Sequence, residues 1–374
     1  MNSKGFYKVL LGAMMLAPMV TACSSDDDED DVQEWMYLDD NNSTVYVEFD
    51  ASVKDMAGVN SNIDQFKVYG FNTALGYSVF GNTKSRDAQG VDVTRNKDDE
   101  SMWDYVDSKT NAMLKWATLL KYPISFYGIA GEGAGLATIG TKNKLPTLHV
   151  EMPADKDGIV KSEDTNDLLF AKALRLDPSS YLNDSTKIEL DFEHALPLMQ
   201  VRAALVNASD LEVTVKSATI MGLVSAVEYD FNEVMPAWTA YTPKDKTATV
   251  DVALALDKEV TVTGAPASLQ NRGAFVVPQK VKAWSSAAKN DGAGIKIMAR
   301  IRSKASNAYL AGSESEFGEV YVPLDNTELT SGNIYTIDIT FNSIFNADGS
   351  LGYRASYKPV VTPWKEKDEN IILK

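Results

Sequence analysis

The sequence has few of the side chains that most often carry chemistry. One cysteine and two histidines occur among 374 residues. A disulfide within the chain is therefore impossible, and a cysteine-rich zinc site is excluded. Lysine and arginine number 36 against 52 aspartates and glutamates, which gives a net charge of −16. A chain of this sign repels phosphate backbones, so no nucleic-acid partner is expected.

Long apolar runs are scarce as well, and the one at the start of the chain is too short to span a bilayer. It covers Val9–Val20, follows Lys4 and Lys8, and falls short of the roughly 20 residues that a transmembrane helix needs. This pattern predicts a secretion signal. The run ends in Val20-Thr21-Ala22-Cys23, which resembles a bacterial lipobox. We expect residues 1–23 to be a lipoprotein signal peptide and Cys23 to become the lipidated N-terminus, an acyl (palmitate-type) anchor in the outer membrane. A plain secretion signal that contains a cysteine is the alternative.

An acidic segment without basic residues follows the cysteine. Residues 24–40 contain nine negative charges and no positive charge. Such a block has nothing to bury, and it predicts a flexible, solvated tether over residues 24–42. It also resembles the signal with which Bacteroidota export lipoproteins to the outer leaflet. The residues of that signal would be Ser24, Ser25, Asp26, Asp27, Asp28, Glu29, Asp30 and Asp31.

The rest of the chain alternates apolar and polar residues with a period of two. This period is typical of antiparallel strands that bury one face and expose the other. It predicts an all-β protein with few short helices, and the best helical or irregular stretch is Trp103–Leu120. The clearest alternating segments are Thr44–Asp50, Met199–Leu205, Val250–Leu256, Ile295–Arg302 and Tyr335–Phe341.

A turn-rich stretch divides the chain into two halves. Leu176–Lys187 gathers Asp, Pro, Ser and Asn, which favour turns. It predicts an N-terminal domain over residues 43–182 and a C-terminal domain over residues 183–374.

Candidate chemical motifs are incomplete. The glycines of Gly128–Gly135 lack the Gly-Lys-Ser/Thr ending of a phosphate-binding loop and predict a flexible loop. Asp155–Gly158 lacks a calcium ligand that its spacing requires and predicts a surface turn. His149 and His194 lie far apart in sequence, and each is expected to pack rather than to bind metal or catalyse. The sequence therefore predicts no enzyme, no catalytic residue, no metal and no cofactor.

Several segments together resemble the fimbrillin family of Bacteroidota, the type V pilins and their Mfa-like relatives. They include an aromatic strand, a "DLLxA" element, an "LxFxHAL" element and a late "GxxY" strand. In order, the matching segments are Phe66–Phe71, Val79–Asn82, Trp103–Tyr105, Ile124–Ala130, Asp167–Ala171, Leu190–Leu196, Phe275–Gln279 and Gly332–Phe341.

The resemblance implies a fold and a function. The fold would be two tandem transthyretin-like Greek-key β-sandwiches. The function would be that of a structural, accessory or tip subunit of an adhesive surface pilus, assembled after a protease removes the first strand and a strand of another subunit replaces it. Family members have an arginine for this cleavage, whereas this chain offers Lys54.

The resemblance also assigns residues and partners. The first strand would fill its groove with Val45, Val47 and Phe49. A donor strand is expected within residues 360–374. Partners would be other pilin subunits, the outer membrane through the lipid, and an unidentified host or bacterial surface ligand. The candidate donor residues are Val360, Val361, Trp364, Ile371, Ile372 and Leu373.

A second function fits the same anchor, tether and sandwich fold. A non-polymerising, glycan-binding surface lipoprotein would need exposed aromatic side chains on which sugars stack. Trp238 and Tyr241 are the best candidates for that contact.

Overall fold

The computed structural model describes residues 44–53, 63–81, 88–119, 121–142, 145–183, 185–206, 210–231, 238–242, 247–282, 292–324, 327–348 and 350–363. In this part of the chain nearly all regular structure is β-strand, which confirms the all-β prediction. Helical structure there consists of short 3₁₀ turns: η3 (Trp116–Thr118), η4 (Glu132–Leu136), η5 (Ser162–Asp164) and η6 (Pro178–Tyr181). None of the helices in these residues is long and apolar enough to cross a membrane.

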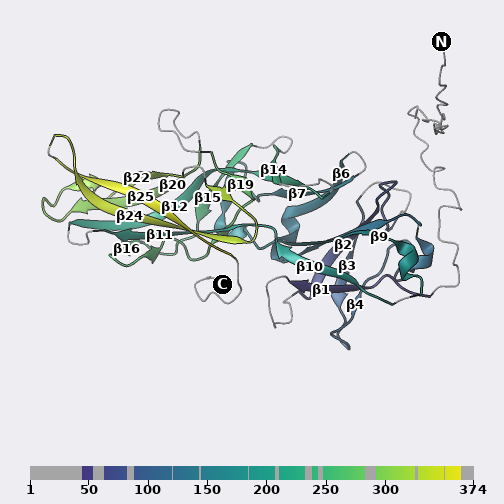
Figure 1. Ribbon diagram of the computed structural model, residues 1–374. Helices are drawn as coiled ribbons and strands as arrows, with labels where there is room; N and C mark the ends of the chain where they lie inside the picture. Colours follow the sequence, from purple (N-terminus) through teal and green to yellow (C-terminus); the bar gives the residue numbers. More distant parts are fainter. Residues whose placement is uncertain are drawn as a thin grey trace, which may run out of the picture.

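The first sheet has seven strands, and its edge is formed by the first strand of the chain (Figure 1). Only the β1–β10 pair is parallel, and the other pairs in this sheet are antiparallel. In spatial order the strands are β1 (Phe49–Val53), β10 (Ile188–His194), β9 (Leu169–Leu176), β5 (Ile124–Ala130), β2 (Gln65–Asn72), β3 (Gly90–Arg95) and β4 (Trp103–Asp104).

A four-stranded antiparallel sheet packs against one face of the first sheet. Its order is β14 (Trp238–Ala240), β13 (Ala226–Asp230), β7 (Leu145–Glu151) and β6 (Ala137–Lys142). Aromatic rings join the two layers: Tyr127 of β5 lies 4.3 Å from Phe231, and Phe170 of β9 lies 5.6 Å from Tyr229, measured between ring centroids.

Two further sheets form the other half of an elongated molecule (Figure 1). One contains, in spatial order, β21 (Tyr309–Ala311), β20 (Gly294–Ser303), β12 (Leu211–Val224), β15 (Thr249–Leu254) and β8 (Ile159–Lys161). In the same sheet β16 (Val260–Val262) pairs with β12, and β22 (Gly318–Pro323) pairs with β20. The other contains β17 (Ala267–Ser268), β11 (Leu198–Leu205), β24 (Asn333–Phe345) and β25 (Leu351–Pro363), with β18 (Ala274–Phe275) paired to β11. A small sheet pairs β19 (Gln279–Lys280) with β23 (Glu328–Leu329).

The alternating segments predicted within residues 199–205, 250–256, 295–302 and 335–341 correspond to β11, β15, β20 and β24. The first predicted strand is displaced: regular pairing begins at Phe49 and runs to Val53, rather than covering Thr44–Asp50. The reason is that Val45 and Val47 form their backbone hydrogen bonds with Trp116 and Leu114 rather than with β10, as described below.

The division of the chain at residue 182 stays a prediction, and the sheets do not follow it strictly. Strand β10 starts after that point but lies in the first sheet. Strand β8 starts before it but pairs with β15 of the other half. Turn-forming residues mark where the chain reverses, and they do not specify which sheet the next strand joins.

The core has two parts on either side of the first sheet. Strand β5 is buried along its whole length because it has a packed layer on each face. Phe126 points into the part that contains β1, whereas Tyr127 and Ile129 point toward the other sheets. Burial raises the pKa of Tyr127 to about 12.

Candidate functional site: the first strand and its groove

The first described segment of the chain, residues 44–53, lies at the outer edge of the seven-stranded sheet (Figure 1). Strand β1 has one neighbour, β10, with which it pairs in parallel from Phe49 opposite Ile188 to Val53 opposite Phe192. A sheet edge exposes a row of backbone groups and can accept or release a strand without disturbing a second neighbour.

The residues that precede β1 form backbone hydrogen bonds on the edge of the segment that faces away from β10. The Val47 N–H donates to the Leu114 carbonyl oxygen at 2.8 Å, and the Trp116 N–H donates to the Val45 carbonyl oxygen at 3.1 Å. The Ile188 N–H then donates to the Glu48 carbonyl oxygen at 2.8 Å. The segment therefore passes from one backbone partner to another at Glu48.

The side chains that face inward hold the segment more firmly than this short ladder. Val47 is 0% exposed and Phe49 is 1% exposed, and Val45 packs against the same core. The Phe49 ring lies 5.5 Å from Phe126 and 5.7 Å from Tyr105, measured between centroids. Burying an apolar side chain of this size contributes roughly 1.5–3 kcal/mol, so removal of the segment would leave a deep apolar groove.

A buried tyrosine connects the segment to the loop beside it. The Tyr105 hydroxyl donates to the Val47 carbonyl oxygen at 2.9 Å and accepts a hydrogen bond from the Leu114 N–H at 3.2 Å. Burial raises the pKa of Tyr105, so the hydroxyl stays protonated and can donate. The sequence shows Tyr105 only as part of a Trp-Asp-Tyr motif. Its contact with Val47 was not predictable because the two residues are 58 positions apart.

The described part of the predicted donor segment forms the end of β25. This strand pairs antiparallel with β24 and is itself an edge strand. Its last six residues, Lys358–Pro363, are all exposed. Val360 is 38% exposed and Val361 is 50% exposed, so both are held far less tightly than Val47 or Phe49.

Several predicted site residues lie outside the described residues. They are the lipidation site, the acidic export signal, the cleavage site and the end of the donor segment: Cys23, Ser24, Ser25, Asp26, Asp27, Asp28, Glu29, Asp30, Asp31, Lys54, Trp364, Ile371, Ile372 and Leu373.

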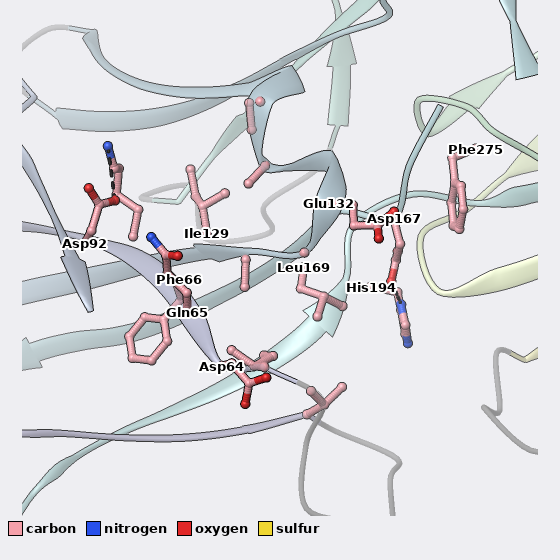
Figure 2. A pocket seen from close by; sticks show the side chains of 18 of the residues that line it. Asp64, Gln65, Phe66, Asp92, Ile129, Glu132, Asp167, Leu169, His194 and Phe275 are labelled. Atoms are coloured by element: carbon pink, nitrogen blue, oxygen red, sulfur yellow. Dashed lines mark hydrogen bonds and ion pairs between the residues drawn. The ribbon is translucent and has the colours of Figure 1, made fainter. Parts of the chain in front are cut away.

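A groove of about 970 Å³ lies where the two halves of the molecule meet (Figure 2). Asp167 and His194 are at one end, joined by a contact of 2.9 Å between Asp167 Oδ2 and His194 Nδ1. Asp64 and Asp92 are set apart from that pair (Figure 2). The described residues contain no group of three or more His, Cys, Asp or Glu side chains that could hold a metal ion.

The incomplete motifs of the sequence have structural roles. The segment Gly128–Gly135 ends β5 and forms η4, where the positive φ of 87° at Gly131 allows a close approach to the backbone of Asp167. Asp155 forms a surface turn, in which its Oδ1 accepts hydrogen bonds from the N–H groups of Asp157 and Ile159. Nε2 of His149 lies 2.9 Å from the Thr147 hydroxyl.

The two aromatic residues predicted to contact glycans face different surroundings. Trp238 packs against Tyr229 at 4.9 Å and Phe170 at 6.2 Å, between the first two sheets. The ring of Tyr241 instead lies 5.4 Å from His149. Residues three apart in extended chain point to opposite sides, so these rings do not form one stacking surface. The glycan-binding alternative gains no support from them.

Comparison with other proteins concerns the fold. No protein-family model and no curated protein matches the chain. A fimbrial protein from Bacteroides vulgatus has a similar fold, with a TM-score of 0.51 and 14% identity over 86% of this chain and 99% of that one. A candidate cell adhesion protein from Bacteroides uniformis aligns with a TM-score of 0.40 and 18% identity, over 86% and 98%. The fimbrial anchor protein Mfa2 from Porphyromonas gingivalis aligns with a TM-score of 0.37 and 10% identity, over 85% and 97%.

Proposed function

We propose that this chain, which has the fold of a fimbrial protein, is a subunit of a surface pilus that supports cell adhesion. Its subunits would join by exchange of β-strands. The observation that carries the proposal is the position of the first strand, which lies at a sheet edge with Val47 and Phe49 buried in the core. The fold likeness supports it independently.

Strand exchange has a clear physical basis at such an edge. A new strand restores the backbone hydrogen bonds of β10, while alternate side chains enter the pockets that the old strand leaves. A groove emptied of Phe49 would expose apolar surface and unpaired backbone, and it would bind a replacement strand or aggregate. Removal of the first strand therefore provides a trigger for assembly.

The trigger in this proposal is proteolysis after Lys54. Strand β1 ends one residue earlier, at Val53, so a cut there would separate the whole of β1 from the rest of the sheet. The separated segment would remain bound through its buried side chains until another strand displaces it.

The donor in this proposal is the C-terminal end of another subunit, within residues 360–374. Val360 and Val361 are exposed in β25, and exposed apolar residues at a strand end gain burial on transfer to a groove. The apolar residues Trp364 and Ile371–Leu373 extend the same candidate segment.

The proposal also covers location and partners. Acylation of Cys23 would anchor the chain in the outer membrane, and residues 24–42 would hold the folded part away from the lipid at the cell surface. Its partners would be other pilin subunits and a surface ligand of the host or of another bacterium. The work of such a subunit is binding and assembly rather than catalysis.

Limited trypsin digestion of the purified chain tests the proposal. We expect cleavage at Lys54 to convert monomers into multimers that are visible by size-exclusion chromatography and electron microscopy. Lys54→Gln should remain monomeric under the same digestion, and a chain lacking residues 360–374 should be cleaved without assembling. Assembly that is unchanged by that truncation would exclude the donor role, and cleaved wild-type protein that stays monomeric would refute the pilus function.

A further inference from the structure

The outward face of the strand-exchange site carries an unfavourable arrangement of charge. Side chains of Glu189, Asp191 and Glu193 all point outward and are exposed along β10. On the neighbouring strand, Asp50 lies directly opposite Glu189. Paired strands lie about 4.8 Å apart, and like charges in directly opposed positions destabilise a sheet. The resident first strand thus combines a well-fitted apolar face with a repulsive polar face.

Within the part of the chain that the structure describes, no basic side chain relieves the repulsion between Asp50 and Glu189. Asp191 accepts a hydrogen bond of 2.6 Å from the Ser52 hydroxyl, which satisfies one oxygen without adding positive charge. Neither Asp50 nor Glu189 makes an ion pair within the described residues. A strand with a basic residue in the position of Asp50 would replace a repulsion with an attraction.

The inward face defines which apolar side chains such a strand needs. After Val45, four positions, each two residues from the next, point toward the core: Val47, Phe49, Ala51 and Val53. The second position is aromatic and lies between Tyr105 and Phe126. The third is small and only half-buried. The site therefore fits an aliphatic, an aromatic, a small or compact, and an aliphatic residue in alternation.

Strand β25 of this chain approaches that pattern, with an alanine in the first position. Its residues 355–361 read Ala-Ser-Tyr-Lys-Pro-Val-Val. Placing Tyr357 in the position of Phe49 puts Ala355 at Val47, Pro359 at Ala51 and Val361 at Val53. The same alignment puts Lys358 at the position of Asp50, opposite Glu189.

The proline is compatible with this register. In a parallel pair the backbone of alternate residues bonds to the neighbour, and Glu48 provides the carbonyl that bonds to Ile188. The Ala51 N–H is therefore directed away from β10, and it bonds to the Asp50 side chain at 2.9 Å instead. Proline at this position removes no hydrogen bond from the ladder, which is the condition under which an edge strand tolerates proline.

We infer that the edge of β10 selects its incoming strand by charge as well as by shape, and that this strand is residues 353–361 of a second copy of the chain, with Lys358 facing Glu189. The donor strand then overlaps the segment 360–374 only at Val360 and Val361. The inference rests on the proposed strand exchange and specifies its partner and register. Lys358 is exposed and makes no ion pair within the described residues. In its present position it lies opposite Asp338, whose carboxylate binds Arg202 at 2.7 and 2.9 Å.

A peptide-exchange experiment on the cleaved full chain tests this register. The protein is cut at Lys54, and mass spectrometry confirms the cut site. A fluorescent peptide of residues 351–363 is then added, and binding is measured by anisotropy together with release of the fragment that ends at Lys54. We expect the K358E peptide to bind about tenfold more weakly than the wild-type peptide at low salt, because an attraction becomes a repulsion. The difference should shrink at high salt.

A matched control makes the same charge change at another outward position. Arg354 would occupy the position of Tyr46, which pairs with Lys115 rather than with β10. The R354E peptide should therefore bind as well as the wild-type peptide or better. Protein with Glu189→Lys should reverse the order and prefer the K358E peptide. The Y357F peptide should bind at least as tightly as wild type, because the Phe49 site accommodates a ring without a hydroxyl.

The outcomes separate this inference from the proposed function. Equal binding of the wild-type and K358E peptides, or an equal loss for R354E, would overturn the register even if the cleaved protein assembles into filaments. Tight binding by a peptide of residues 364–374 alone would place the donor strand after residue 363 and would overturn the inferred register as well. The peptides could also bind with the expected order of affinities while the cleaved protein forms no multimers. That result would support the groove assignment and refute the pilus function.

Discussion

Truncation of one buried side chain in the first strand, Phe49→Ala, gives the sharpest test of how that strand is held. Phe49 is 1% exposed and contacts the rings of Tyr105 and Phe126. Removal of a fully buried phenylalanine costs about 3–5 kcal/mol through lost burial and the cavity left behind. In the intact chain we expect the free energy of unfolding, measured by urea denaturation, to fall by that amount.

The same variant should act more specifically after cleavage at Lys54. The fragment that contains Phe49 is then bound without a covalent link, so a loss of 3–5 kcal/mol weakens its binding by a factor of about a hundred to several thousand. Size-exclusion chromatography of the cleaved protein should show the fragment leaving. Tyr46→Ala is the control, since Tyr46 is 41% exposed and its loss should cost less than about 1 kcal/mol. A Phe49→Ala effect below that value would show that the inward face does not anchor the strand.

Three further predictions concern the surroundings of the groove. Tyr105→Phe removes the hydroxyl that bonds to Val47 and Leu114. The free energy of unfolding should fall by about 2–4 kcal/mol, because two buried backbone groups lose their partner. An unchanged urea midpoint would contradict this. Asp107→Ala should cost a similar amount, since this buried carboxylate accepts hydrogen bonds from three backbone N–H groups; thermal denaturation measures it. Burial raises the pKa of Tyr127 to about 12, so the contribution of this residue to stability should be constant below about pH 10 and decrease by about 3 kcal/mol toward pH 12 and above, where the unfolded chain loses the proton more readily. Tyr127→Phe should reduce the alkaline loss of stability by that amount, and an identical pH profile for the variant would assign the effect to other groups.

The sequence predicts strands well where one face is uniformly apolar. In β11, Met199 and Val201 are buried while Gln200 and Arg202 are partly exposed, and the alternation is visible in the sequence itself. The same alternation does not predict which strands pair when they are far apart in the sequence. Nothing local in residues 145–161 indicates that β7 and β8 pair with strands from the second half of the chain, because the backbone hydrogen bonds of extended strands are alike and do not specify the partner.

For the same reason, the sequence predicts only the local features of the candidate site. The inward residues Val45, Val47 and Phe49 follow from period-two alternation, which depends only on local geometry. The change of backbone partner at Glu48 involves residues 114–116, which belong to an irregular segment without periodicity. By contrast, the separation of Trp238 from Tyr241 was accessible from the sequence, since a spacing of three in a strand places two side chains on opposite faces.

Backbone hydrogen bonds and side-chain contacts contribute in different ways to holding the first strand in place. Backbone hydrogen bonds to β10 are generic, because any extended chain can form them, so they cannot determine which strand occupies the edge. Shape is more selective: the position of Phe49 accepts a ring because Tyr105 and Phe126 surround it. Charge on the outer face then disfavours the resident Asp50 beside Glu189. An edge with these three properties can hold its own strand through apolar fit until cleavage and still prefer a better-matched strand afterwards.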